Sequence, residues 1–351
     1  MDKKVLMVYA STRGITETAP GMVMLNLQRR SRLDIEIVCN GLRPVPESTH
    51  KITGLVPGTL TKLITHILSL FPYGTKKDWF MTSDMDTIRY YVEVMRYLRK
   101  LKPTIAIVHV SYTVTWLIKW VYRRTEVVYY HHGGNMHVKL TDKQWERLVK
   151  ACPQLIISVT QFAIDGCRVK YKKLPDKMAN IHNGIEINNN GLDPISKIKI
   201  WDSNDVFVFC YAGHFVFSKG LHIILSAFKS VSEKHPKARL LLIGDWTDKR
   251  ESRIDVLLAV YNKLPNVVKK KIYITGIVSN TVAQEYIKTA DAAILASQQT
   301  EGLSLFALEA MNCGLPIIMT GVGGNSELND PAIPCCLFFN PLDDQIDQLT
   351  Q

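Results

Sequence analysis

Residues 296–320 read ASQQTEGLSLFALEAMNCGLPIIMT, and this stretch is the most informative part of the chain for fold and site. Gly302, next to Glu301, breaks the regular secondary structure at this point. The following LSLFALEAM predicts a helix, because its apolar residues recur at helical spacing. Glu301 is then expected in the loop that opens the helix, with Glu309 about two turns into it. At a rise of about 1.5 Å per residue, the two carboxylates lie about 10–12 Å apart.

This separation is too large for a shared metal ion or for a single water molecule between an acid and a base. It suits an extended ligand with hydroxyl groups at both ends and negative charge between them. The backbone N–H groups of Leu303, Ser304 and Leu305 are expected to point outward at the start of the helix, where anions bind. A nucleotide sugar has this shape. The alternative, that both glutamates only complement the helix macrodipole, stays open on spacing alone.

The same stretch resembles the signature of retaining GT-B glycosyltransferases of family GT4, including their Glu-x7-Glu motif. The resemblance is strongest over residues 182–340 and weakest over the first hundred. It is carried by these further segments: YHHGG (130–134), HNGIEI (182–187), YAGHFVFSKG (211–220), LLLIGDW (240–246), YITGIVSNTVAQEYIKTADAAIL (273–295) and GVGGNSEL (321–328).

The resemblance implies an α/β fold of GT-B type, with two Rossmann-like doubly wound domains facing across a cleft. It implies a metal-independent, retaining transfer of a hexose or N-acetylhexosamine from a nucleotide diphosphate sugar, with a UDP-sugar preferred. The acceptor is expected to be a glycan or a lipid-linked saccharide. No cofactor is expected, since the nucleotide sugar is a co-substrate. In this family the reaction proceeds on one face of the sugar without an obligatory protein nucleophile.

The resemblance also implies roles for particular residues. His132 lies beside the donor sugar and Glu301 orients the sugar hydroxyls, so these two are the catalytic candidates. Glu309 is expected at the ribose hydroxyls, and Lys219 with His214 at the diphosphate. The full set of expected donor-binding residues is Gly14, His214, Lys219, Ile277, Val278, Gly302, Leu303, Ser304 and Glu309.

His214 departs from the family pattern, which usually has arginine at this position. A histidine with an ordinary pKa of about 6.5 is only partly charged at neutral pH and lacks the planar fork of arginine. We therefore expect a weaker hold on the diphosphate, which improves as the pH falls toward 6.

No metal or dinucleotide site is expected. The loop STRGI at 11–15 lacks the GxGxxG fingerprint, which counts against an NAD-dependent enzyme. Asp84-Met85-Asp86 resembles the metal-binding DxD of a different glycosyltransferase fold. A helix N-cap at Ser83 or Asp84, with Asp86 in the first turn, explains these acids better. His131, His132 and His137 cluster in sequence, but no further ligand has zinc-site spacing.

Length and composition predict about two domains, since the chain has 351 residues, 46% of them hydrophobic. The expected boundaries are an N-terminal, acceptor-side domain at 1–185, a turn-rich linker at 186–204 and a C-terminal, nucleotide-sugar-binding domain at 205–351. The final LDDQIDQLTQ begins a helical pattern and stops, so the terminal crossing helix of the family is expected to be missing. We expect no signal peptide, no transmembrane helix and seven reduced cysteines in the cytoplasm.

Charge divides unevenly along the chain. Residues 1–183 contain 28 Lys and Arg against 14 Asp and Glu, a balance of +14, whereas residues 184–351 contain 15 against 18, a balance of −3. The excess suggests an anionic partner for the first half. The sequence has no recognised nucleic-acid-binding signature, so the expected anionic partner is a membrane surface or an acidic glycan. A membrane partner would attach the protein peripherally to the inner face of the membrane. Simple solvation of a basic protein stays open.

Residues 59–71 have helical apolar spacing and are the candidate for an interfacial helix, although a core-facing helix is preferred. Expected strands at 4–10, 34–40, 105–110, 126–132 and 155–160 alternate with helices, which predicts a parallel sheet. Two other functions stay open. One is a nucleotide-sugar epimerase on the same fold, and the other is a non-catalytic nucleotide-sugar-binding protein, which His214 makes credible.

Overall fold

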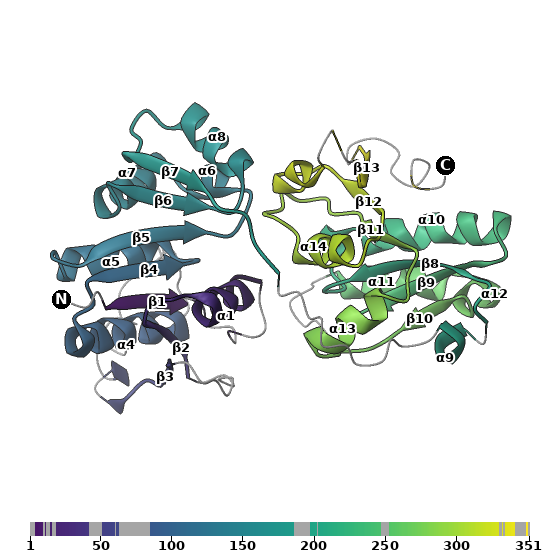
Figure 1. The fold of residues 1–351 in the computed structure, drawn as a ribbon, viewed down its shortest axis with the longest axis horizontal. Coiled ribbons are helices and arrows are strands. Elements are labelled where there is room, and N and C mark those ends of the chain that lie inside the picture. Colours follow the sequence, from purple (N-terminus) through teal and green to yellow (C-terminus); the bar gives the residue numbers. More distant parts are fainter. Residues whose placement is uncertain are drawn as a thin grey trace. The chain divides into compact units, whose positions relative to one another are not determined.

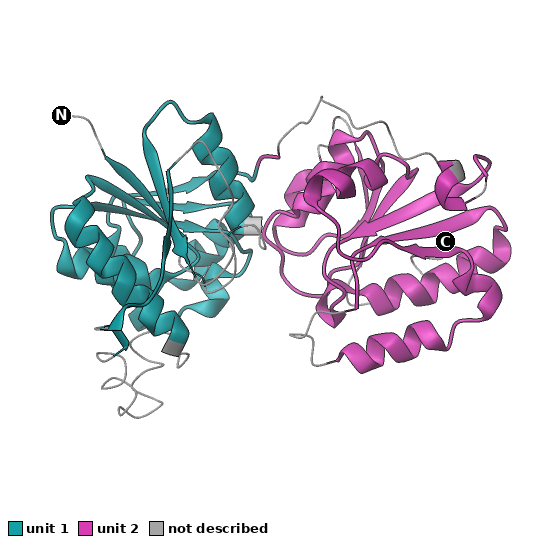
Figure 2. Cartoon of the chain, turned by 90° about the horizontal axis from the view of Figure 1, so that it is seen from below, with its two compact units in different colours: residues 1–183 teal, residues 184–351 magenta. Residues whose placement is uncertain are grey.

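The computed structural model describes all residues except 1–3, 10, 12–14, 16–18, 42–50, 60, 63–84, 186–196, 202, 247–252, 330–331, 333, 341–348 and 350–351. The chain divides into two compact units, residues 1–183 and 184–351 (Figure 2). Each unit is built on one parallel sheet, of seven strands in the first and six in the second.

The first unit alternates strands with helices along the chain, as its hydrophobic pattern predicts (Figure 1). Its elements are β1 Val5–Tyr9, α1 Ala19–Arg30, β2 Ile35–Asn40, β3 Ile52–Leu55, α4 Met85–Leu101, β4 Ile105–His109, α5 Tyr112–Val121, β5 Glu126–His131, α6 Met136–Lys139, α7 Asp142–Ala151, β6 Leu155–Ser158, α8 Gln161–Lys170 and β7 Lys177–Asn180.

The strand order of this sheet is β3-β2-β1-β4-β5-β6-β7, and every pairing is parallel. Side chains of β1 alternate between the two faces, as a strand requires. Leu6 and Val8 join a core that includes residues of α4, α5 and α7. Val5 and Met7 join a separate core with residues of α1. Helices therefore cover both faces of the sheet.

The second unit repeats this pattern (Figure 1). Its elements are α9 Lys197–Trp201, β8 Phe207–Ala212, the 3-10 helix η2 Phe217–Lys219, α10 Leu221–Lys234, β9 Ala238–Ile243, α11 Ile254–Asn262, α12 Asn266–Lys269, β10 Ile272–Ile274, α13 Asn280–Ile287, β11 Ala292–Leu295, α14 Leu305–Asn312, β12 Ile317–Thr320, the 3-10 helix η3 Gly324–Leu328 and β13 Cys336–Phe339.

The strand order of the second sheet is β10-β9-β8-β11-β12-β13. The order changes direction between β8 and β11, which makes this the switch point of the sheet. Helix α10 packs on the sheet through Leu221, Ile224, Leu225 and Phe228, all buried, as the periodicity predicts. Figure 2 shows helices on both sides of this sheet as well. The prediction of two doubly wound units is confirmed.

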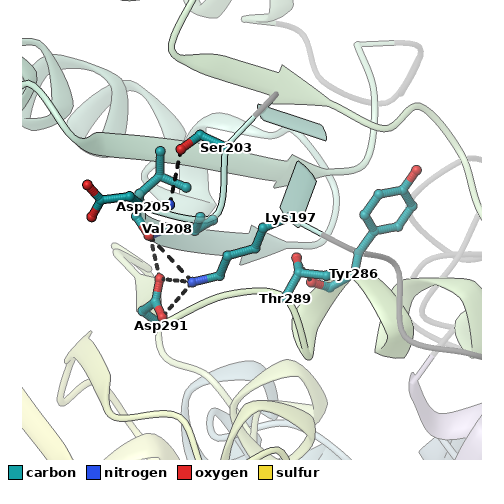
Figure 3. Close-up of polar contacts among 8 residues, drawn as sticks. Lys197, Ser203, Asp205, Val208, Tyr286, Thr289 and Asp291 are labelled. Atoms are coloured by element: carbon teal, nitrogen blue, oxygen red, sulfur yellow. Dashed lines mark hydrogen bonds and ion pairs between the residues drawn. The ribbon is translucent and has the colours of Figure 1, made fainter. Parts of the chain in front are cut away.

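An ion pair attaches helix α9 to the second unit. Lys197 Nζ lies 2.7 and 2.6 Å from the two carboxylate oxygens of Asp291, and Asp291 also accepts a 2.8 Å hydrogen bond from the amide of Val208 (Figure 3). One carboxylate thus joins α9 to the first residues of β8 and to the turn before β11. The linker expected at 186–204 includes this helix, and residues 186–196 and 202 lie outside the described residues.

Several other sequence predictions concern the same elements. Helix α4 begins at Met85, and Asp86 in its first turn pairs with Arg89 at 2.9 Å, a local role for that acid. Most of the candidate interfacial helix at 59–71, and the helical pattern at 342–349 apart from Leu349, lie outside the described residues. Among the helices that the structure describes, none is long and apolar enough to cross a bilayer.

Candidate active site

The best candidate site in the second unit lies at the switch point of its sheet. The loop after β8, residues 213–220, and the loop after β11, residues 296–304, leave the carboxyl ends of two neighbouring strands. Open parallel sheets bind ligands in the crevice formed where such loops diverge. Lys219 and Glu301, which the sequence singled out, stand on these two loops.

Lys219 and Glu301 meet in an ion pair. Lys219 Nζ lies 2.7 Å from Glu301 Oε1, and the two side chains keep 28% and 12% of their exposed surface. Both groups are therefore largely withdrawn from bulk water but remain reachable. A cation beside a carboxylate can bind a phosphate oxygen on one side while the carboxylate accepts hydrogen bonds from hydroxyl groups on the other.

Close backbone packing fixes the lysine. Gly220 has φ 71°, a left-handed conformation, and serves as the N-cap of α10. A Cβ atom on Gly220 would lie 1.9 Å from the carbonyl oxygen of Ala296. Because only glycine lacks that atom, the two loops can approach each other here. The amide of Gln298 also donates to the carbonyl of Ser218 at 2.9 Å.

The glutamate is held from the other side by the loop after β12. Gly323 forms a parallel bridge with Glu301, and the amide of Gly324 donates to the Glu301 carbonyl at 3.1 Å. A Cβ atom on Gly323, which has φ 65°, would lie 2.4 Å from that carbonyl oxygen. The segment 321–324 therefore acts as a support that orients the Glu301 backbone.

Helix α14 begins later than the sequence suggests. Ser304 is its N-cap and accepts a hydrogen bond from the amide of Ala307 at 3.3 Å. The amide of Ser304 donates to Asn325 Oδ1 at 3.2 Å, so this N–H is already engaged by the protein. The buried Leu303 packs into the core of the unit, so its side chain has a structural role. Glu309 lies slightly more than one turn into the helix rather than two.

Glu309 is held by the helix that follows the edge strand β10. Its Oε1 accepts a 2.9 Å hydrogen bond from Asn280 Nδ2, and Gln284 Nε2 donates to Asn280 Oδ1 at 3.1 Å. Burial raises the pKa of the Glu309 carboxyl, while the hydrogen bonds from Asn280 and Gln284 lower it. Burial is the larger effect, so the ionised form is harder to maintain than in an exposed glutamate.

The segment 276–278, expected at the nucleobase, leads into the same helix. Gly276 has φ 73°, and Thr275 Oγ1 donates to its carbonyl at 2.8 Å. The side chain of Ile277 is 79% exposed, whereas Val278 packs against the core. Asn280 thus connects this segment to Glu309 through one hydrogen bond.

His214 lies in the loop after β8 with its side chain exposed. Its carbonyl accepts hydrogen bonds from Tyr211 Oη at 2.8 Å and from the amide of Val216 at 2.9 Å. The backbone at this position is therefore fixed by the buried tyrosine. Gly14, the remaining donor-binding candidate, lies outside the described residues.

In the first unit, the polar residues at the carboxyl edge centre on a pair of histidines. His109 ends β4, and His132 follows β5, the neighbouring strand. His109 Nδ1 lies 2.7 Å from His132 Nε2. The His132 ring stacks on those of His109 and Tyr130, and the His109 and Tyr130 rings are tilted by 37° at a centroid distance of 5.0 Å. His109 is completely buried.

Both histidines are neutral across the working pH range. Burial lowers the pKa of His132 to about 3, and burial together with His132 lowers that of His109 well below its ordinary value. In the contact between the two rings, one nitrogen donates its N–H and the other accepts. Among the described residues, neither His132 Nδ1 nor His109 Nε2 has a hydrogen-bond partner, although both atoms are buried. The uncharged imidazole of His132 can therefore take part in a hydrogen bond but supplies no positive charge.

The alternation of β5 separates His132 from its neighbour. His131 contacts Tyr129, whose Oη lies 3.2 Å from His131 Nδ1, whereas His132 stacks on Tyr130. His137 packs against Phe162 instead of joining either histidine. Over the described part of the chain, no three His, Cys, Asp or Glu side chains gather in a way that could hold a metal ion.

Sequence reasoning placed Lys219, Glu301 and Ser304 in one region, and the structure brings them together. It missed His109, Asn280 and Asn325, which contact the candidates. A signal existed for two of them. His109 ends a buried strand beside the one that leads to His132, and Asn280 follows the N-cap Ser279 directly after the expected nucleobase segment.

Comparison with known proteins adds independent findings. Residues 195–349 match the family described as "Glycosyl transferases group 1". An uncharacterized glycosyltransferase of Methanocaldococcus jannaschii is 29% identical over 153 residues, 43% of this chain and 35% of the relative. The spore coat protein SA of Bacillus subtilis is 22% identical over 256 residues, 70% of this chain and 67% of the relative. The chain thus spans little more than a third of the length of the archaeal relative.

Solved structures are similar over almost the whole chain. HepE of Anabaena, in complex with UDP, has a TM-score of 0.72 at 14% identity, covering 99% of this chain and 88% of that one. Sucrose-phosphate synthase of Thermosynechococcus elongatus has a TM-score of 0.70 at 16% identity, covering 98% and 87%. At these identities the likeness concerns the fold, and it confirms the predicted GT-B type of two Rossmann-like domains.

Proposed function

Because residues 195–349 match the family of glycosyl transferases group 1, we propose that the protein is a member of it, GT4, and transfers a sugar from a nucleotide diphosphate sugar to an acceptor hydroxyl. The observation that carries this proposal is the Lys219–Glu301 pair at the switch point of the second sheet. It offers a phosphate-binding cation and a hydroxyl-binding carboxylate within one hydrogen-bond length of each other. A sugar phosphate needs a cation at its phosphate oxygens and a hydrogen-bond acceptor at its sugar hydroxyls, on the two sides of the bond that breaks.

The chemistry follows from where charge develops. When the bond between the sugar and the diphosphate breaks, negative charge grows on the departing nucleoside diphosphate. Lys219, at the entrance to α10, stabilises that charge together with the helix N-terminus. Glu301 holds the sugar hydroxyls, so that the reacting carbon stays in place while the bond lengthens. His214 assists at the diphosphate when protonated.

The other end of the donor is assigned to Glu309 and the segment 276–278. Glu309 accepts hydrogen bonds from the ribose hydroxyls, and the exposed backbone around Ile277 contacts the base. Asn280 supports this assignment because it links the two parts. A UDP-sugar is the proposed donor, since HepE was solved with UDP-glucose and a Salmonella typhimurium relative, 29% identical over 129 residues, is an N-acetylglucosaminetransferase.

The first unit is proposed to serve the acceptor and to add His132 beside the donor sugar. A neutral imidazole there can hydrogen-bond a sugar hydroxyl without attracting the diphosphate. We propose a retaining, metal-independent transfer of hexose or N-acetylhexosamine to a glycan or a lipid-linked saccharide, with Gly14 close to the donor phosphates.

Release of nucleoside diphosphate from UDP-glucose and UDP-N-acetylglucosamine tests the proposal, with wild type compared with Lys219→Ala. Transfer or slow hydrolysis by wild type, reduced by about a hundredfold or more in the variant, is expected. Asp245, outside the Lys219–Glu301 pair, provides a control as Asp245→Asn.

Two other functions predict different results. A nucleotide-sugar epimerase would invert one carbon of the donor sugar and would need no acceptor. It would release nucleoside diphosphate only if its mechanism cleaves the donor. A non-catalytic binding protein would bind the donor and leave it intact. Chromatography of the nucleotide sugar after prolonged incubation distinguishes all three.

A further inference from the structure

The excess positive charge of the first unit is concentrated where its strands begin. In the parallel sheet, Val5 of β1 pairs with Ile35 of β2 on one side and with Ile105 of β4 on the other. Ile105 pairs in turn with Glu126 of β5. These four strands therefore start side by side at one edge, and the chain segments that lead into them are neighbours.

Three of these segments, 29–34, 99–104 and 123–126, are named here the basic edge. They contain eight Lys and Arg against two Asp and Glu, and all eight basic side chains are exposed. Hydrogen bonds hold two of the segments together, since Thr125 Oγ1 donates to the Pro103 carbonyl at 3.0 Å and the amide of Glu126 to the Thr104 carbonyl at 2.9 Å.

Large apolar side chains protrude at the same edge. Trp120, at the end of α5, is 64% exposed, and Leu33 is 60% exposed. Trp120 stacks on Trp116 with ring centroids 6.0 Å apart and planes at 10°, and Trp116 packs against the core. Trp116 therefore holds the exposed indole of Trp120 in place.

Helix macrodipoles explain only part of the charge. Arg29, Arg30, Arg99 and Lys100 lie in the last turns of α1 and α4, where cations are favourable. The others, Arg32, Lys102, Arg123 and Arg124, lie beyond the helix ends. Within the described residues, none of these four has a carboxylate partner within ion-pair distance. Their charge is available to an outside partner.

We propose that the basic edge is a docking surface for an anionic lipid bilayer. Lysine and arginine side chains lie at the level of anionic headgroups, and Trp120 and Leu33 enter the interface, where tryptophan is favoured. Protruding aliphatic and indole groups among cations favour a bilayer over a nucleic acid, which would leave Leu33 in water. His109 and His132 lie at the opposite ends of these strands, so docking at the basic edge does not involve them. The inference does not depend on sugar transfer.

Vesicle flotation with the full chain tests this docking. Vesicles of phosphatidylcholine are compared with vesicles that also contain about 30 mol% phosphatidylglycerol, because Lys and Arg are attracted to an anionic membrane surface. Binding is expected only to the anionic vesicles at about 0.1 M salt, and it should be lost near 1 M, where screening is strong. Absence of binding to anionic vesicles overturns the proposal.

The double variant Arg123→Glu/Arg124→Glu should weaken vesicle binding by at least about tenfold, since it reverses two headgroup contacts. Lys263→Glu/Lys270→Glu is the matched control, because it changes the net charge equally at exposed positions of the second unit. If the first pair fails to fold, as judged by thermal melting, Arg32→Glu/Lys102→Glu replaces it. Equal loss in the control would show that only net charge matters and would contradict a specific surface.

Trp120→Ser should weaken binding to anionic vesicles, whereas Val267→Ser, which removes an exposed apolar side chain of the second unit, should not. Unchanged binding of Trp120→Ser would contradict insertion at this edge. A competition in which an RNA or DNA oligonucleotide binds the basic edge more tightly than anionic vesicles, at equal salt, would also overturn the assignment to lipid.

Discussion

At the scale of single residues, the candidate site depends on side chains whose surroundings set their protonation. Burial makes His132 neutral and makes Glu309 harder to ionise. Neither effect can be derived from residue type, because both depend on which neighbours exclude water. His109 contacts His132, and Asn280 contacts Glu309, in each case from another element of the same unit.

Glu309 should matter for holding the donor more than for breaking its bond. Glu309→Gln and Asn280→Ala should each raise the donor KM several-fold, by about 1 kcal/mol per lost hydrogen bond, with a smaller fall in kcat. Steady-state kinetics with varied UDP-sugar checks this. Val267→Ala, which changes an exposed side chain of α12 and leaves Asn280, Gln284 and Glu309 in place, is the control. A large fall in kcat at constant KM would contradict the ribose role.

The raised pKa of Glu309 gives a pH dependence of defined sign. Ionised Glu309 accepts hydrogen bonds from the ribose hydroxyls, and this form is lost as the pH falls through its pKa. Because burial raises that pKa above 4.5, donor affinity should begin to fall at a higher pH than for an exposed glutamate. Calorimetric titration with UDP across the acidic range checks this. Glu309→Gln should abolish this part of the dependence, and an unaltered profile in that variant would contradict the assignment.

His214 should produce the opposite trend nearer neutrality. An ordinary imidazole gains its charge as the pH falls toward 6, and a bound diphosphate favours the charged form. UDP affinity should therefore rise from pH 8 to pH 6 in wild type. His214→Arg should bind more tightly and lose this dependence. Affinities that stay flat with pH in both proteins would speak against a diphosphate contact.

His109 is expected to position His132. His109→Phe keeps the ring volume but removes the 2.7 Å contact, and a misplaced His132 should lower kcat by about tenfold or more. His109→Asn, which can restore a hydrogen bond near Nδ1, should recover part of the loss. If both variants melt like wild type and retain full kcat, His132 does not need this partner.

At the scale of elements, glycines with left-handed backbone let the loops after β8, β11 and β12 converge. Gly220 and Gly276 provide a matched comparison, with φ 71° and 73°. A Cβ atom on Gly220 would collide with the Ala296 carbonyl, whereas one on Gly276 meets nothing within 4 Å.

Gly220→Ala should therefore lower the free energy of unfolding by about 3 kcal/mol or more, because backbone strain and a steric clash add. Gly276→Ala should cost only about 1–2 kcal/mol of strain. Denaturant unfolding of both variants checks this difference. Equal losses would mean that the loops move apart without cost and that the geometry of Lys219 is not fixed by Gly220.

Much of this organisation follows from the sequence. The strands at 4–10, 105–110 and 126–132 are predicted to within one residue at each end, because each is a short, mostly apolar run that fits the length of a buried strand. The sequence predicts both Glu301 and Lys219 at the donor, the first at the sugar hydroxyls and the second at the diphosphate. Their contact could not be foreseen, since it depends on β8 and β11 being adjacent, which is a property of strand order.

The start of α14 shows another limit. Apolar periodicity places the helix at 303–311, but Ser304 caps it, and the amide of Ser304 binds Asn325 from the loop after β12. Helix periodicity carries no information about a partner twenty-one residues away. For the same reason, His132 was identified but the buried pair with His109 was not.

At the scale of the whole molecule, the two units share one architecture but differ in charge and in proposed task. The second unit, close to neutral, matches a glycosyltransferase family and carries the donor candidates. The first unit, with a balance of +14 from 28 basic and 14 acidic residues, carries the basic edge and the neutral histidine pair. Donor binding can therefore be tested independently of membrane attachment.

Lys219 and Glu301 are proposed to bind the nucleotide diphosphate sugar together. Calorimetric titration of UDP into wild type and Lys219→Ala tests it most directly. Saturable binding by wild type, weakened by about tenfold or more in the variant because a charged hydrogen bond is lost, is the predicted result. Failure of wild type to bind UDP, GDP or ADP, or equal affinity in the variant, would contradict the account.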